Sequence, residues 1–144
     1  MFITAHLITS FIAAAAFGII FNVPKKELFK CGFVGMVGWA IYIILESYFS
    51  IDMILATLIA SVFIAIISQT FARFYKTPII IFNVSGIIPL VPGGMAYDAM
   101  RHIVENDYNT AVQLAAKAFM VSGAIAIGLV FSEVMNQIIK KSKI

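Results

Sequence analysis

Five hydrophobic runs separated by short charged connections occupy most of this chain, and all but the fourth are about long enough to cross a lipid bilayer. A membrane-spanning helix needs about 20 predominantly apolar residues. The runs extend roughly from Phe2 to Val23, Cys31 to Phe49, Met53 to Phe74, Pro78 to Pro92 and Ala111 to Ile139. We therefore expect an all-α, polytopic membrane protein whose residues 1–144 form a single transmembrane domain.

The composition points to the same class. Hydrophobic residues make up 62% of the chain, charged residues 12%, and the mean hydropathy is +1.01, whereas soluble domains are about half apolar and a quarter charged. The segment from Met1 to Phe21 lacks the basic start of a signal peptide, so we expect it to be retained as the first span. The lone Cys31 and the absence of Cys/His ligand spacing predict no disulfide, no metal site and no cofactor.

The distribution of Lys and Arg predicts the orientation of the spans. Basic residues in short loops mark the cytoplasmic side of a membrane protein. With five spans, the first connection, the third connection and the C-terminal tail share one side and carry eight of the ten basic residues: Lys25, Lys26, Lys30, Arg73, Lys76, Lys140, Lys141 and Lys143. We expect the N-terminus outside and the C-terminus inside; a re-entrant fourth run would place the tail lysines outside, which the charge rule disfavours.

The fourth run begins with helix-start signals. Thr77 before Pro78 predicts a helix with a side-chain cap and a first-turn proline. At about 1.5 Å per residue, this helix reaches only about 15 Å by Ile88, which is half of the hydrocarbon core. The helix then meets the stretch "IIPLVPGGMAYDAM".

Two prolines and two glycines in this stretch predict a break near the membrane midplane. Pro89 and Pro92 each remove a backbone donor, which frees the carbonyls of Ser85 and Ile88, and they favour extended conformations at Ile88 and Val91. The glycines that follow permit a tight turn before a helix resumes over Met95 to Tyr108. We therefore expect one broken span.

The break is also the strongest functional signal. Unwound backbone at this depth must be buried in protein or line a watery cavity, and broken helices whose ends point at a midplane site recur in secondary transporters. Exposed carbonyls would bind cationic or hydroxyl groups, and the amides at the new helix N-terminus would bind a carboxylate. The alternative is a kink that only shapes packing. The candidate substrate-binding residues are Asn83, Ser85, Gly86, Pro89, Pro92, Gly93 and Gly94.

Glu133 is a second candidate, because an ionisable residue within a span is a functional hypothesis by default. Together with Asn136, three residues later, it forms a polar patch on one face of the last helix, and we predict a coupling or gating role for this pair. The alternative is that Glu133 extends to the interface or pairs with a tail lysine. Polar residues that recur along the third run either line the same cavity or form ordinary interhelical bonds: Thr57, Ser61, Ser68 and Gln69.

The stretch "IIPLVPGGMAYDAM", followed by the helix from "AAKAF" to "IIKK", resembles the small second subunit of the bacterial threonine/serine exporter family. In this family a larger membrane subunit and a small five-span subunit are encoded separately or fused. The resemblance covers nearly the whole chain, and its specificity rests mainly on the segment from Asn83 to Asp98. It implies a bacterial inner-membrane protein that exports threonine and serine, or a dicarboxylate such as succinate, with a larger partner subunit.

An odd number of spans suggests how such a partner would bind. A homologous odd-span subunit inserted the other way up would complete an inverted repeat with the substrate site between the two chains. A homo-oligomeric pore is the alternative, since small residues on several helices permit close packing.

Other functional classes have less support in the sequence. A scaffold subunit that does not transport would use the break for packing alone. No nucleophile and base at workable spacing suggest an enzyme. The basic residues flank the spans and form no continuous basic face, so we expect no nucleic acid partner.

Overall fold

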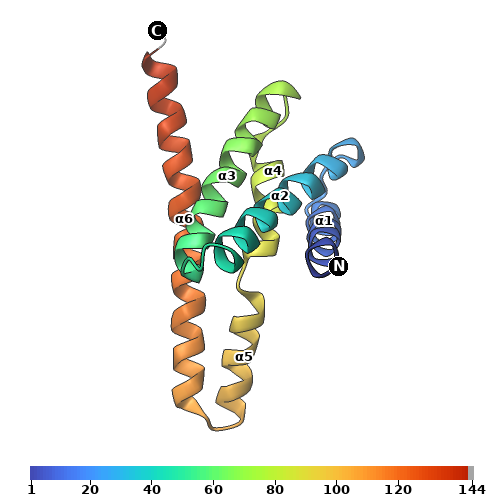
Figure 1. The fold of residues 1–144 in the computed structure, drawn as a ribbon. Helices are drawn as coiled ribbons and strands as arrows, with labels where there is room; N and C mark the ends of the chain where they lie inside the picture. The colour runs from blue at the N-terminus through green and yellow to red at the C-terminus, as the bar shows by residue number, and fades with distance from the viewer. Residues whose placement is uncertain (143–144) are drawn as a thin grey trace.

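The computed structural model describes residues 1–142, and the secondary structure of these residues is entirely helical (Figure 1). Lys143, one of the tail lysines used to predict the orientation, lies outside the described residues. The elements are α1 (Phe2–Ile20), η1 (Lys25–Glu27), α2 (Leu28–Ser47), α3 (Met53–Phe74), α4 (Ile79–Ile87), η2 (Ile88–Leu90), α5 (Gly93–Val104) and α6 (Tyr108–Ser142).

Four helical segments are long and apolar enough to cross a membrane: Phe2–Ile20, Lys25–Ser47, Met53–Phe74 and Tyr108–Ser142. A fifth span is formed if Ile79–Leu90 and Gly93–Val104 count as one, and these two segments meet at an angle of 51°. The prediction of a polytopic all-α protein with a broken fourth helix is therefore confirmed.

The helix before the break starts differently from the prediction. Pro78 lies outside α4 as its N-terminal flanking residue, and the Thr77 hydroxyl donates to the carbonyl of Tyr75 at 3.1 Å. The predicted Thr77 cap and first-turn Pro78 were therefore wrong by one residue, because the Thr77 side chain bonds backward into the turn that ends α3.

The break itself is narrower than predicted. Ile88 keeps a helical conformation (φ −51°, ψ −45°), and only Val91 is extended (φ −63°, ψ 127°). Pro89 lies in the first turn of η2, where a helix does not use the backbone N–H that proline lacks. The Val91 N–H donates to the Ile88 carbonyl at 3.2 Å, so the acceptor that Pro92 was expected to leave free is satisfied.

The two glycines do not form the turn. Gly93 and Gly94 are the first residues of α5, and no glycine in the described chain has a positive φ. Val91 and Pro92 change the direction of the chain instead, and the Gly93 N–H closes this turn by donating to the Val91 carbonyl at 2.8 Å. Helix α5 thus starts two residues before the predicted Met95.

Small residues bring the helices into close contact, as their composition predicted. Gly35 of α2 lies against Ala14 of α1, and a Cβ atom added to Gly35 would overlap the Ala14 side chain. The same holds for Gly128 of α6 against Ser61 of α3. These approaches give van der Waals contact between helices in lipid, where the hydrophobic effect does not drive helix association.

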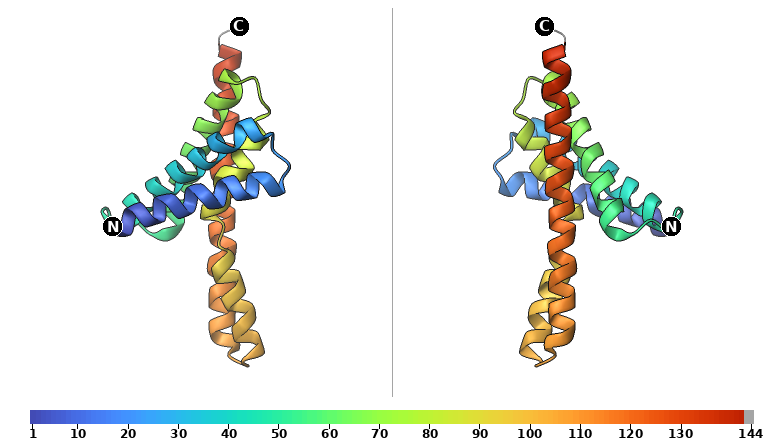
Figure 2. Two further views of the ribbon diagram at one scale, coloured as in Figure 1. Left: turned by 90° about the vertical axis from the view of Figure 1, so that its right-hand side faces the viewer. Right: turned by 90° about the vertical axis from the view of Figure 1, so that its left-hand side faces the viewer.

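Helix α6 runs the full height of the molecule and has two different neighbours (Figures 1 and 2). Its N-terminal part packs against α5, and its C-terminal part packs against α3. Helices α1, α2 and α4 lie on the other side of α3, with α4 contacting α1, α2 and α3. The connection between α5 and α6 lies at the opposite end from the connection between α3 and α4.

The first and third connections lie near each other. The Lys30 ammonium is 3.4 Å from the centroid of the Tyr75 ring, and it also pairs with Glu27 at 2.7 Å. This contact links the start of α2 to the segment that follows α3. Two of the connections that carry the basic residues are therefore side by side.

Candidate functional site

A cavity of about 230 Å³ opens directly at the break in the fourth span. Residues of η2 and the start of α5 form one wall, and α2, α3 and α6 supply the others. The lining includes Pro89, Pro92, Gly94, Trp39 and Thr57. The break therefore borders a pocket formed by several helices.

The pocket combines an aromatic wall with a few polar groups. The rings of Trp39 and Tyr42 stack with centroids 5.0 Å apart, and the Thr57 hydroxyl donates to the Met53 carbonyl at 2.8 Å. That hydroxyl keeps its acceptor lone pairs for another partner.

Backbone N–H groups at the start of α5 add donors to the lining. The Gly93 N–H bonds to Val91 and the Ala96 N–H to Pro92, whereas the N–H groups of Gly94 and Met95 belong to the first turn, which has no acceptors within the helix. Gly94 and Met95 both line the pocket. Free amides at a helix N-terminus favour an anionic group such as a carboxylate.

The structure divides the predicted substrate-binding residues into two groups. Pro89, Pro92 and Gly94 line the pocket. Ser85 and Gly86 are buried in helix packing instead, and a Cβ atom on Gly86 would lie 2.6 Å from Cγ1 of Val34.

The other two predicted residues also lie outside the lining of the pocket. Gly93 borders an apolar groove of about 440 Å³ between α5 and α6. Asn83 lies in the middle of α4, where its Oδ1 atom and the hydroxyl of Ser85 are buried without a hydrogen-bond partner in residues 1–142.

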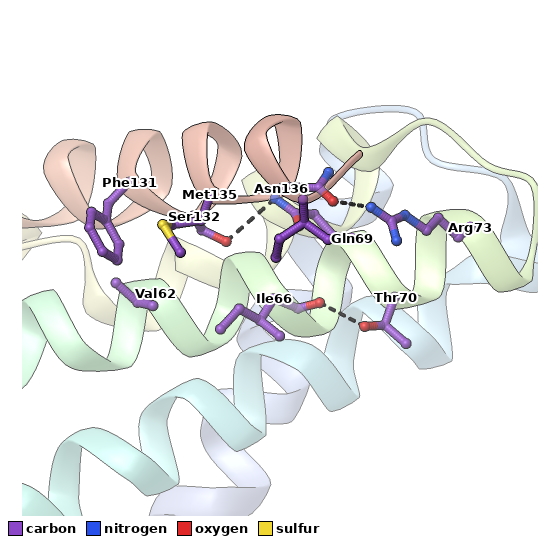
Figure 3. A pocket seen from close by; sticks show the side chains of 10 residues that line it. Val62, Ile66, Gln69, Thr70, Arg73, Phe131, Ser132, Met135 and Asn136 are labelled. Carbon is purple, nitrogen blue, oxygen red and sulfur yellow. Dashed lines mark hydrogen bonds between the residues drawn. The ribbon is translucent and has the colours of Figure 1, made fainter. Parts of the chain in front are cut away.

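Glu133 and Asn136 belong to a separate polar site between α3 and α6, and Figure 3 shows the part of it formed by Gln69, Arg73, Ser132 and Asn136. Gln69 Nε2 lies 3.4 Å from Ser132 Oγ and 3.4 Å from Glu133 Oε2. The Arg73 guanidinium donates to the Asn136 amide oxygen. Polar side chains of α3 and α6 thus bond across the interface of these helices.

Two cavities flank this set of bonds. One has a volume of about 400 Å³ and is lined mostly by apolar residues with Thr70 and Ser132, while the other has a volume of about 220 Å³ and includes Glu133 and Lys140. Gln69, Arg73 and Asn136 line both cavities. Asn83 and Ser85 line neither cavity, and Glu133 bonds to Gln69 and Gln137.

Several pocket residues were not identified from the sequence. Trp39 and Tyr42 resemble ordinary residues of an apolar span, and Arg73 resembles a positive-inside anchor at a helix end. A signal existed for the polar site, because Gln69 and Arg73 are spaced i, i+4 and Ser132 and Asn136 are also spaced i, i+4. The predicted polar residues of the third run do not share one cavity, since Thr57 lines the break pocket and Gln69 the polar site.

A family model described as "Threonine/Serine exporter, ThrE" matches residues 6–135. This range includes the break pocket and Glu133. No solved structure matches the chain.

Proposed function

Because the chain belongs to the threonine/serine exporter family, we propose that it is a subunit of a secondary transporter that exports small polar metabolites, with the substrate bound at the break of the fourth span. The observation that carries this proposal is the coincidence of the break with a cavity of about 230 Å³. Broken helices at midplane sites are characteristic of secondary transporters.

The lining of the break pocket suggests how a substrate binds. The free amides of Gly94 and Met95 donate hydrogen bonds to a substrate carboxylate. The stacked rings of Trp39 and Tyr42 present π faces to an ammonium group. The Thr57 oxygen accepts a hydrogen bond from a substrate hydroxyl.

This chemistry favours a hydroxyl amino acid over a dicarboxylate. Among residues 1–142, no charged side chain lines the break pocket. A serine or threonine zwitterion brings no net charge into it, whereas the second carboxylate of succinate would be desolvated without a cationic partner, which costs free energy. We infer that threonine and serine are the preferred substrates.

The transporter acts with a larger membrane subunit in the bacterial inner membrane, and its N-terminus faces outward. The distribution of basic residues supports this orientation. The five-span count supports pairing with a homologous partner of opposite orientation, which would enclose the break pocket between two chains. Homo-oligomers of this chain are the alternative assembly.

The test is the efflux of preloaded labelled serine, threonine and succinate from cells that express this chain with and without its genomic neighbour. The Gly94→Leu substitution fills the pocket, and Gly123→Leu is the matched control because a Cβ atom at Gly123 meets no other atom within 4 Å. We expect export only with both chains, a loss in Gly94→Leu at equal membrane abundance, and normal export in Gly123→Leu.

Two outcomes would overturn the proposal. If no substrate moves in any combination, the chain is not an export subunit. If Gly94→Leu lowers the assembly of the complex and export in parallel, the break serves packing and the chain acts as a scaffold.

A further inference from the structure

The polar site between α3 and α6 holds charges of both signs that do not pair with each other. Arg73, Lys140 and Glu133 line the same cavity of about 220 Å³. Within residues 1–142, no ion pair of 4.0 Å or less involves any of the three. Opposite charges in one small cavity normally attract each other, so their separation needs a cause.

Neutral amide side chains form hydrogen bonds with both Glu133 and Arg73. Gln69 Nε2 lies 3.4 Å from one Glu133 oxygen, and Gln137 Nε2 lies 3.2 Å from the other. The Arg73 guanidinium donates to the Asn136 amide oxygen. These bonds engage the carboxylate and the guanidinium with neutral partners, so that neither charge is neutralised.

Both charges keep free bonding capacity. A guanidinium has five N–H donors, and its planar fork matches a carboxylate with two parallel bonds. The Glu133 carboxylate has about four lone-pair positions, of which the two amides use two. The cavity is therefore lined by a cation, Arg73, and an anion, Glu133, that can both form further hydrogen bonds.

We propose that this cavity is a second substrate site, in which Arg73 binds the α-carboxylate and Glu133 binds the α-ammonium group of an amino acid. Lys140 also lines this cavity and adds positive charge to it. A ligand with only one of the two charges leaves either Arg73 or Glu133 without a charged partner. The cavity therefore selects for a zwitterion.

This site is distinct from the break pocket. Thr57 lines the break pocket and Gln69 lines the polar cavity, and their separation of twelve positions along α3 corresponds to about 18 Å of helix. The inference rests on the proposed function, because it assigns the polar cavity as a second binding site on the export pathway that includes the break pocket.

A zwitterionic phospholipid headgroup carries the same pair of charges, so the experiment must separate the two sources. The chain is copurified with its genomic neighbour and placed in nanodiscs of phosphatidylglycerol, which has no ammonium group. Every protein in this experiment also carries Gly94→Leu, which fills the break pocket and excludes binding there. The measurement is the competition of labelled serine by unlabelled serine, by N-acetylserine and by serine methyl ester.

We expect serine to bind at least roughly tenfold more tightly than either analogue, because a hydrogen bond to a charged group contributes about 1.5 kcal/mol or more. Glu133→Gln should abolish the preference for serine over N-acetylserine alone. Arg73→Gln should abolish the preference for serine over the methyl ester alone, and Arg73→Lys should retain most of it. The control is Lys141→Gln, which removes a positive charge from the same helix end outside the cavity lining.

The proposal is overturned if both variants weaken all three ligands equally, if neither changes the preferences, or if phosphatidylethanolamine displaces serine. The last result would assign the cavity to a lipid headgroup. A misfolded variant cannot imitate the expected result, because each substitution removes one preference and keeps the other. If the preferences follow the prediction while no export is found in cells, the second site stands and the proposed function fails.

Discussion

Gly128 of α6 lies directly against Ser61 of α3, so that a Cβ atom on Gly128 would overlap the Ser61 hydroxyl and lie 3.0 Å from the Leu58 carbonyl oxygen. At this contact the two helices that carry the polar site approach each other closely. Any side chain at position 128 must separate them. The interhelical bonds of Gln69 and Arg73 therefore depend on a glycine one to two turns away on the neighbouring helix.

We predict that Gly128→Ala lowers the free energy of unfolding by about 1–3 kcal/mol, the usual cost of overpacking a tight interface. Thermal unfolding in detergent measures the effect. Gly123→Ala is the matched control on the same helix, because a Cβ atom there meets no other atom within 4 Å. Equal unfolding temperatures for the two variants would contradict the tight contact.

Two glycines of the predicted substrate site should respond in opposite directions to alanine. A Cβ atom on Gly86 would lie 2.6 Å from Val34 and 3.0 Å from Ile64, whereas one on Gly94 is free of contacts within 4 Å. We expect Gly86→Ala to destabilise the protein by about 1–3 kcal/mol. Gly94→Ala should be neutral or stabilise α5 by up to about 1 kcal/mol, since alanine is the better helix former. Chemical denaturation of both variants tests this difference in sign.

The cap of α6 should make the stability of the α5–α6 hairpin depend on pH. Hydrogen bonding from the side chain and backbone N–H of Thr110 lowers the pKa of Asp107 below its ordinary value of 3.8. The folded state thus favours the carboxylate, and the cap's contribution is present above pH 3.8 and is lost as the pH falls through the lower, folded pKa.

The measurement is hydrogen exchange of the α6 N-terminal amides between pH 2 and pH 5, corrected for the intrinsic exchange rates. Protection should fall on acidification in the wild type. In Asp107→Asn, which keeps an acceptor oxygen but cannot ionise, protection should vary less with pH. An identical pH profile in both proteins would refute the assignment of the cap.

The contact between Lys30 and Tyr75 should stabilise the packing of the first connection against the third. An ammonium 3.4 Å from a ring centroid is a close cation–π geometry. Tyr75→Leu should lower the free energy of unfolding by about 0.5–2 kcal/mol, while Tyr75→Phe, which keeps the ring, should remain near the wild type. A matching loss in Tyr75→Phe would instead attribute the effect to the phenol hydroxyl.

The architecture was predictable where single-residue properties decide it. Apolar runs of sufficient length specify spans because the bilayer has a fixed thickness, and Pro92 disfavours a continuous helix because it lacks a backbone N–H. The predicted start of α4 was wrong by one residue because the Thr77 side chain, which could have capped α4, donates instead to the carbonyl of Tyr75. Ile88 stayed helical because the neighbouring Pro89 fits the first turn of η2.

The sites were predictable only in part, because they depend on which helices become neighbours. Pro92 and Gly94 predict the break from the sequence. Trp39 and Thr57 line the pocket beside it only because the helices pack together. In lipid, a face that meets another helix is as apolar as one that meets acyl chains, so hydrophobic periodicity does not identify partners. The bond of Arg73 to Asn136 follows from α3 lying beside α6, which no local pattern specifies.

Helix α6 has a mechanical consequence for the two sites. It continues without a proline or a break from Tyr108 to Ser142, beside α5 over one part and beside α3 over the other. Gly128, between these two parts, lies in close contact with Ser61 of α3. If α5 moves at the break, a continuous α6 carries that displacement past Gly128 toward Glu133 and Asn136. The helix thus gives the two sites a direct structural connection.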